Sequence, residues 1–186
     1  IGDEVIDLGR GMVGDIDPTH PGMEVWSTTG GLYNARENKV VEADTELCPW
    51  PHLGIWWDGD VLLELFNDGK IEKWNWEEPS TSNKVPRITQ ISKFGGVTNG
   101  RNPTLIGDIL GDWREEVIVT SAKMDELLIF TTDKPSDIRL YTLAHNPNYR
   151  NDLTVKGYIQ SHHVDYFLGQ GMEQPPQPNI RYTQRA

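Results

Sequence analysis

Short apolar segments separated by turn residues run along most of the chain. They read MVGDI, MEVWS and GLYNA in the first part, LGIWWD, VLLELF and KIEKWNW in the middle, and TLIGDI, EEVIVTSA, ELLIFTT and IRLYTLA later. Their alternation and their β-branched and aromatic residues favour β-strands. Besides GLYNA and IRLYTLA, the pattern predicts strands near residues 11–16, 22–28, 53–58, 61–66, 71–76, 103–108, 115–121 and 126–132.

Helical patterning is almost absent. No window of a dozen residues keeps a period of 3.6, and 18 glycines and 12 prolines interrupt the 186 residues. The run Asn67-Asp68-Gly69 predicts a hairpin turn between two of the strands. We therefore expect an all-β fold.

Acidic turns recur along this pattern. GDIDPTHPGMEVW begins at Gly14, GDILGDWREEVIV begins at Gly107, and the shorter IWWDGD lies between them. The first aspartates of the three turns, Asp15, Asp58 and Asp108, are separated by 43 and 50 positions. A period of this size, with several short strands in each unit, is typical of β-propeller blades or a related β-repeat array.

The acidic turns gather hard oxygen ligands at the ends of strands. Calcium takes about six to eight such oxygens from flexible loops. The predicted calcium ligands are Asp15, Asp17 and Glu24 in the first loop and Asp108, Asp112 and Glu116 in the third. The middle turn, with Asp58 and Asp60, fits either a third calcium or a plain hairpin turn. For all three loops the alternative is an ordinary polar turn with solvated carboxylates.

Composition narrows the class of protein. The length allows one domain, residues 1–186, with 37% apolar residues for its core, and residues 172–186 read as a Pro-rich extended tail. A net charge of −11 argues against nucleic acid and anionic membranes as partners. The single cysteine, Cys48, excludes an internal disulfide and is expected to be buried. We find no membrane span, and a removed targeting segment before Ile1 stays open.

Three repeats are too few for a closed propeller. Propellers close with about four to eight blades, and an open array leaves strand edges unpaired. We therefore expect the chain to be one piece of a larger propeller or to complete one by oligomerising.

Several strings resemble a known enzyme family. LGRGMVGDIDPTHPGMEVWS, LGIWWDGD, NGRNP, IGDILGDWREEVIV and RLYTLAHNPNYRNDLT are similar to the C-terminal part of rhamnogalacturonan lyases of polysaccharide lyase family eleven. The resemblance runs from about Asp7 to Gly169. It implies an eight-bladed β-propeller carrying Ca²⁺, of which this chain would supply about three blades and a closing strand, with N-terminal blades of the same enzyme as partner.

The same resemblance implies an activity. Enzymes of this family cleave the rhamnose–galacturonate linkage of rhamnogalacturonan I, an acidic plant cell-wall polysaccharide, by β-elimination, and they are secreted, periplasmic or cell-surface proteins of bacteria. Removing the C5 proton of a galacturonate places negative charge on its carboxylate, so the site needs a cation there and a base near C5. The rival function from another class is a non-catalytic, calcium-stabilised β-repeat module that binds carbohydrate or protein.

Residues for this chemistry follow from the matching strings. Arg10 in LGRGM, Arg101 in NGRNP and Tyr158 in VKGYIQ are the expected catalytic residues, and Asn99 and Gly100 are expected to contact substrate. Where the family often reads Asn-Gly-Thr-Lys, this chain reads Asn-Gly-Arg-Asn. The alternatives are a tight Asn-Gly turn, two surface arginines and a tyrosine packed in the last strand.

Tryptophans and histidines receive mostly structural roles. We expect blade packing for the tryptophans at strand positions, Trp26, Trp56, Trp57, Trp74, Trp76 and Trp113. Trp50, in a loop, is the best sugar-stacking candidate. No histidine is assigned to a metal, and the pattern gives His52 no role.

Overall fold

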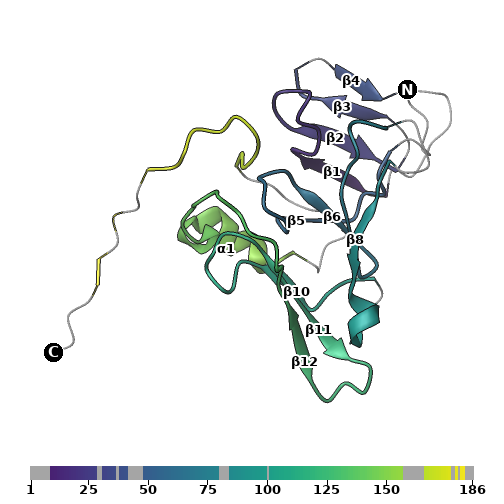
Figure 1. The fold of residues 1–186 in the computed structure, drawn as a ribbon, viewed down its shortest axis with the longest axis vertical. Helices are drawn as coiled ribbons and strands as arrows, with labels where there is room; N and C mark the ends of the chain where they lie inside the picture. Colours follow the sequence, from purple (N-terminus) through teal and green to yellow (C-terminus); the bar gives the residue numbers. More distant parts are fainter. Residues whose placement is uncertain are drawn as a thin grey trace.

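The chain folds into three successive sheets. The computed structural model describes residues 9–28, 31–36, 38–41, 48–79, 84–99, 101–156, 166–176, 179 and 181–182. Within these residues each sheet has four strands, and the sheets follow one another in sequence order (Figure 1). The predicted β class is confirmed, since strands far outnumber helices among the described residues.

The first sheet is a meander of adjacent antiparallel strands. Its strands are β1 (Gly11–Gly14), β2 (Glu24–Ser27), β3 (Leu32–Asn34) and β4 (Asn38–Val41), in the order β1-β2-β3-β4. Glu24 faces Gly14 on one side and Asn34 on the other. This register places the glutamate of the first acidic loop at the start of an inner strand, between β1 and β3.

The second sheet repeats the same order. Its strands are β5 (Leu53–Ile55), β6 (Glu64–Asn67), β7 (Lys70–Glu72) and β8 (Arg87–Gln90), in the order β5-β6-β7-β8. The predicted hairpin turn joins β6 to β7, and Asp68 and Gly69 have φ angles of 51° and 71°. Left-handed conformations at two successive residues are what a tight hairpin requires. The turn prediction is therefore confirmed.

The third sheet differs at one edge. Its strands are β9 (Gly96–Val97), β10 (Leu105–Gly107), β11 (Glu116–Ser121) and β12 (Leu127–Phe130). β12 pairs with one side of β11, whereas β10 pairs with residues 116–118 and β9 with residues 120–121. The segment between β9 and β10 thus has both ends anchored along β11.

One predicted strand was wrong, and one short helix was not predicted. The segment IRLYTLA is not a strand: it ends in the short 3-10 helix η3 (Leu143–His145), and the N–H of Leu143 donates to the Asp108 carboxylate. A seven-residue helix, α1 (Pro147–Leu153), follows it. Asn146 caps α1 through its side chain and Pro147 suits its first turn. A helix this short shows no periodicity in a window of a dozen residues.

Further short elements were not predicted. They are the strands β4, β8 and β9 and the 3-10 helix η2 (Ile91–Phe94). β4 and β8 carry only one or two apolar residues each, and β9 has two residues. Such segments lack the alternation that identifies a strand, and pairing with their neighbours determines their structure.

The core lies between the sheets. Trp26, Trp56, Trp57, Trp74 and Trp113 are buried, as predicted, while Trp76 is partly buried. Leu63 packs where the first two sheets meet, because a Cβ on Gly14 or Gly54 would come within 2.4 or 2.6 Å of its Cδ2 atom. Only glycine leaves room for this close approach.

The same backbone bond joins each sheet to the next. The N–H of Leu63 donates to the carbonyl of Asp15 at 2.7 Å, and the N–H of Glu115 donates to the carbonyl of Trp56 at 2.7 Å. Each donor directly precedes a glutamate that begins a strand, Glu64 of β6 and Glu116 of β11. The two junctions therefore have equivalent geometry.

The C-terminal segment returns to the first two sheets. Leu168 joins the core, the ring of Tyr166 stacks on that of Trp56 with centroids 6.5 Å apart, and the N–H of Gln170 donates to Asp15 Oδ2. Beyond it, the described residues of the expected tail, 172–186, form neither helix nor strand (Figure 1). Among the described residues, none of the helices has the length and apolar character needed to cross a membrane.

Candidate functional site

His52 contacts the two chain segments that carry Arg10 and Arg101, and we call these three residues the His52 group. His52, directly before β5, is 1% exposed. Its Nε2 atom lies 2.8 Å from Asn102 Oδ1, and its backbone N–H donates to Met12 Sδ at 3.0 Å. His52 thereby connects the start of the second sheet to β1 and to the NGRNP segment.

The NGRNP segment is a tight turn. Asn99 and Asn102 exchange two backbone hydrogen bonds of 3.0 Å, so only two residues, Gly100 and Arg101, separate the bonded pair in the sequence. Arg101 is exposed and has a φ of 78°, a left-handed conformation that is costly for a residue with a Cβ. The turn thus presents Arg101 at its tip. Gly100 lies outside the described residues.

The pKa of His52 is lowered by burial and by the two arginines. Burial lowers this pKa below its usual 6.5, and the positive charges of Arg10 and Arg101 lower it further. The hydrogen bond to Asn102 and the backbone of Phe66 oppose the shift. The neutral imidazole is therefore favoured, and both predicted arginines act on one side chain.

Beyond the two arginines and their turn, the sequence indicated roles for Tyr158 and Trp50 but not for His52 and Asn102. Tyr158 lies outside the described residues, so its predicted place near the arginines stays a prediction. Trp50 is 46% exposed and stands two residues before His52, which suits the predicted stacking role. Sequence reasoning missed His52 and Asn102, because no local signal links two residues 50 positions apart.

Each acidic loop is closed by its glutamate. Glu24 Oε2 accepts the backbone N–H groups of residues 16 and 17, Glu64 Oε2 those of residues 57 and 58, and Glu116 Oε2 those of residues 109 and 110, at 2.8–3.2 Å. On the neighbouring strand the three glutamates face Gly14, Ile55 and Gly107. In every sheet the two donors are the second and third residues after this facing residue. A buried carboxylate thus satisfies two turn N–H groups that have no strand partner.

The second oxygen of each glutamate binds the third strand or its extension. Glu24 Oε1 accepts from Asn34 Nδ2 at 2.9 Å, Glu64 Oε1 lies 2.9 Å from Lys73 Nζ, and Glu116 Oε1 accepts from Thr131 Oγ1 at 3.1 Å. The glutamates are therefore fixed by the protein itself, in the same way in all three sheets.

The first loop buries more negative charge than it neutralises. Asp17 accepts hydrogen bonds from Thr19 and from Trp74 Nε1, whereas Asp15 Oδ1 is buried and accepts no hydrogen bond from the described residues. Burial raises the pKa of Asp15 to about 7, the backbone bond from Gln170 opposes this, and the charges of Glu24, Asp17 and Asp60 add to it. A cation beside Asp15 would relieve this cost.

The middle loop brings its carboxylates together. Asp58, Asp60 and Glu64 each have an oxygen within 4.8 Å of the others, a spacing that could hold a metal ion. The Nζ atom of Lys73 lies among them, 2.7 Å from Asp58 Oδ2 and 2.6 Å from Asp60 Oδ2. Burial lowers the pKa of Lys73, but Glu64, Asp58 and Asp60 outweigh burial and raise it, so the side chain stays charged.

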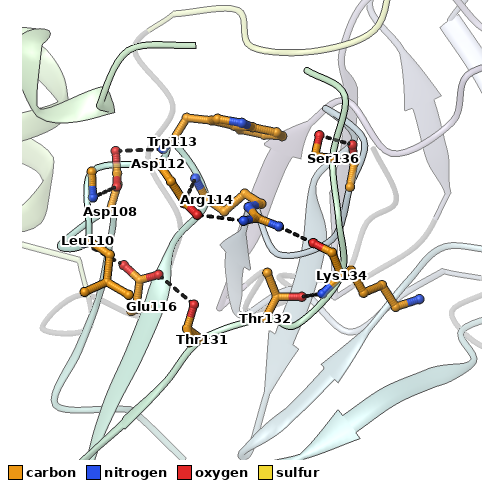
Figure 2. Close-up of polar contacts among 12 residues, drawn as sticks. Asp108, Leu110, Asp112, Trp113, Arg114, Glu116, Thr131, Thr132, Lys134 and Ser136 are labelled. Atoms are coloured by element: carbon orange, nitrogen blue, oxygen red, sulfur yellow. Dashed lines mark hydrogen bonds and ion pairs between the residues drawn. The ribbon is translucent and has the colours of Figure 1, made fainter. Parts of the chain in front are cut away.

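The third loop directs its carboxylates to separate partners (Figure 2). Asp108 accepts the backbone N–H groups of residues 111, 113 and 143, and Asp112 pairs with Arg114 at 2.6 Å. Glu116 binds the turn and Thr131. Of the described residues, those of this loop form no group as close as that of the middle loop.

A buried network beside the third loop connects the helix to the sheets. Tyr149 of α1 donates its hydroxyl to Glu115 Oε1 at 2.8 Å and accepts the N–H of Asp108 at 2.7 Å. Lys156 Nζ lies 2.6 Å from the same glutamate oxygen, and Glu115 Oε2 accepts the N–H of Trp56. The network joins the third sheet, the middle loop and the segment that leads to Tyr158.

Comparison with known proteins gives one consistent family. A family model described as rhamnogalacturonan lyase family 11, C-terminal domain, matches residues 2–178. The chain is 41% identical over 184 residues to the rhamnogalacturonan endolyase YesW of Bacillus subtilis (strain 168), and 35% identical over 192 residues to the rhamnogalacturonan exolyase YesX of the same organism. These matches cover 95% and 94% of this chain but 28% and 30% of the relatives.

Solved structures agree with the sequence matches. The crystal structure of YesW superposes on this chain with a TM-score of 0.76 at 40% identity. The superposition covers 94% of this chain and 29% of the YesW chain. A rhamnogalacturonan lyase of Bacillus licheniformis gives a TM-score of 0.78 over 95% of this chain, at 38% identity, and again 29% of its own length. The chain therefore spans less than a third of the length of these relatives.

Proposed function

This chain belongs to rhamnogalacturonan lyase family 11, whose C-terminal domain it matches, and we propose that it forms part of a lyase that cleaves rhamnogalacturonan I. The reaction is β-elimination at the rhamnose–galacturonate linkage. One observation supports the proposal beyond family membership. Arg10 and Arg101, the two arginines that the family resemblance indicates as catalytic, both lower the pKa of His52.

Two arginines in one place suit this chemistry. When the C5 proton of a galacturonate leaves, negative charge builds up on its carboxylate, and the bond to the leaving oxygen at C4 breaks. Arg10 and Arg101 provide positive charge where this carboxylate binds, and they offset the repulsion between an anionic polymer and a chain of net charge −11. Because Arg101 carries its positive charge in this step, the deprotonated hydroxyl of Tyr158 accepts the C5 proton, and Asn99 and Gly100 contact the sugar at the turn.

His52 positions the turn in this scheme. As a neutral, buried imidazole it contacts Asn102 rather than the substrate. The backbone of Asn102 closes the turn that carries Arg101. Arg101 thus reaches the substrate from a turn held by a side chain of another sheet.

The three sheets are proposed to be successive blades of an eight-bladed β-propeller. The equivalent backbone bonds between sheets one and two and between sheets two and three support a regular rotation from blade to blade. The contacts of the C-terminal segment with Asp15 and Trp56 support a closing role for this segment, although its described residues form no strand. N-terminal blades of the same enzyme supply the rest of the propeller and the other walls of the cleft.

Calcium is proposed to stabilise the acidic loops. The first loop, with Asp15, Asp17 and Glu24, supports this best, because Asp15 Oδ1 is buried and accepts no hydrogen bond from the described residues. In the third loop the oxygens of Asp108, Asp112 and Glu116 already bind protein groups, so calcium there stays a prediction. Calcium bound in these loops would neutralise carboxylates and order the loops.

The substrate also suggests a location. Rhamnogalacturonan I is a cell-wall polymer outside the bacterial cell, and we place the enzyme in the periplasm, on the cell surface or in the medium. The acidic composition of the chain is compatible with this.

Activity of the full-length protein tests the proposal. Purified enzyme should release unsaturated galacturonate ends from rhamnogalacturonan I, followed by ultraviolet absorbance, and the isolated chain should be inactive. Arg10→Ala, Arg101→Ala and Tyr158→Phe should each lower kcat by about a hundredfold or more with little change in Tm. Arg36→Ala, at an exposed site in the first sheet, serves as the control. A full-length protein that binds the polymer but never cleaves it would favour the binding module instead.

A further inference from the structure

The middle sheet has a lysine where the other two sheets have neutral residues. Glu24 faces Asn34 across β2 and β3. Continuing the registers of β6–β7 and β11–β12 by one residue places Lys73 opposite Glu64 and Thr131 opposite Glu116. All three partners contact the same oxygen of their glutamate, Oε1. Only the middle one carries a charge.

The ammonium group of Lys73 lies within ion-pair distance of three carboxylates. Nζ lies 2.7 Å from Asp58 Oδ2, 2.6 Å from Asp60 Oδ2 and 2.9 Å from Glu64 Oε1. The side chain is 16% exposed, and the backbone N–H of Lys73 donates to the carbonyl of Pro86 at 3.1 Å. Three short charge-assisted contacts and an anchored backbone hold the group in place.

A divalent ion does not fit beside this ammonium group. Calcium requires oxygens at about 2.3–2.6 Å, and the oxygens that would supply them converge on Nζ. An ion in their midst would lie against a like charge at contact distance, which is strongly unfavourable in a partly buried site. Where the family resemblance implies calcium along the acidic loops, this loop disagrees.

We propose that the Lys73 ammonium group is the resident cation of the middle loop, and that the loop binds a divalent ion only when Lys73 is removed. The lysine closes the loop onto β7 through ion pairs, and because its ammonium group is part of the chain, this closure is independent of calcium concentration. The middle sheet is therefore the calcium-independent member of the three. This inference does not depend on the reaction that the enzyme catalyses.

Calcium stoichiometry of the full-length protein tests the inference. Protein equilibrated with Ca²⁺ and separated from free ion is analysed for bound metal as wild type, Lys73→Asn and Asp60→Asn. Lys73→Asn recreates the pairing of Glu24 with Asn34 and should bind one more Ca²⁺ than the wild type. Asp60→Asn alone should leave the wild-type number unchanged, and Lys73→Asn combined with Asp60→Asn should cancel the gain.

A second measurement locates the new ion. Tb³⁺ emission excited through tryptophan should increase in Lys73→Asn, because Trp57 directly precedes Asp58, and the double variant should lack the increase. Added Ca²⁺ should raise the Tm of Lys73→Asn by more than that of the wild type. Loss of one Ca²⁺ from the wild type through Asp60→Asn would overturn the inference, as would a folded Lys73→Asn protein without an extra ion. If Lys73→Asn does not fold, Lys73→Met, which keeps most of the apolar stem, replaces it, and the wild-type arm still decides.

Discussion

Arg101 combines charge with an unfavourable backbone conformation. Its φ of 78° and its exposed side chain place a guanidinium at the tip of a turn whose base is fixed by two backbone bonds. Backbone strain at an exposed charged residue commonly serves function, because the surrounding structure must compensate for it.

Arg101→Gly separates the two properties. Glycine adopts a positive φ without a Cβ penalty, so Arg101→Gly should be more stable than Arg101→Ala by about 1 kcal/mol. Both variants lack the guanidinium and should lose turnover alike. Calorimetry and initial rates on the full-length protein measure the two effects. Equal Tm values for the two variants would show that the turn is not strained.

His52 should make stability depend on pH in the acid range. Its pKa is lowered in the folded protein, so below the usual value of 6.5 the unfolded chain binds a proton that the folded chain does not. This contribution to stability is complete above pH 6.5 and is lost as the pH falls below it. His52→Gln, which does not titrate, should therefore narrow the difference in Tm between pH 7.5 and pH 5.5.

An exposed histidine provides the control for that prediction. His145→Gln, in η3, should leave the pH dependence unchanged. If His52→Gln preserves the wild-type slope, the buried imidazole is not the group that titrates. A higher KM for His52→Gln at unchanged Tm would support its role in holding the Arg101 turn.

At the scale of the element, the unit of the fold is a strand, an acidic turn and a second strand that begins with glutamate. The glutamate binds the turn with one oxygen and the third strand, or the residue just after it, with the other. The turn can therefore vary in length and composition between the sheets without losing its backbone hydrogen bonds. This explains why the same carboxylate occurs in loops that otherwise differ.

Removal of one such glutamate should destabilise its sheet. Glu24→Ala leaves the buried N–H groups of Ile16 and Asp17 without an acceptor, at about 1–3 kcal/mol each. Glu24→Gln keeps one acceptor oxygen and should cost less. Thermal unfolding in EDTA measures both without a metal contribution, with exposed Glu126→Ala as control. Equal Tm values for Glu24→Ala and Glu126→Ala would contradict the bridging role.

For the whole molecule, the three sheets form one structure through repeated junctions. A tryptophan-rich core, Leu63 against two glycines, and the returning C-terminal segment connect sheets that are distant in sequence. Such arrays gain stability from contacts between neighbouring units, so a change in one loop is transmitted to the next sheet. The carbonyl of Asp15 accepts one of these junction bonds, so the stability of the junction should be sensitive to the charge of the first loop.

Calcium removal should reveal this sensitivity. Exhaustive EDTA treatment is expected to lower the Tm of the full-length protein, and Asp15→Asn should reduce the gain in Tm on adding Ca²⁺ back. Asp125→Asn, at an exposed turn of the third sheet, should keep the full gain. A thermal curve unaffected by EDTA would exclude structural calcium.

The sequence alone determined the strands, the repeat and the family. Alternation and turn residues are local signals, and all the predicted strands except IRLYTLA have counterparts in the structure, as does the Asn67-Asp68-Gly69 hairpin. The pattern did not predict short polar strands such as β8 or the seven-residue α1. Their structure depends on neighbouring strands and on helix caps rather than on periodicity.

Tertiary structure alone decided what each charged side chain contacts. An acidic residue in a loop has the same sequence signature whether it binds a metal, a backbone N–H group or a lysine. The structure assigns the glutamates to backbone and third-strand partners and places Lys73 between Asp58 and Asp60. It also joins His52 to Asn102, a contact across 50 positions that no local pattern encodes. The physical reason is that the packing of strands distant in sequence determines which donor and acceptor atoms come within hydrogen-bond distance.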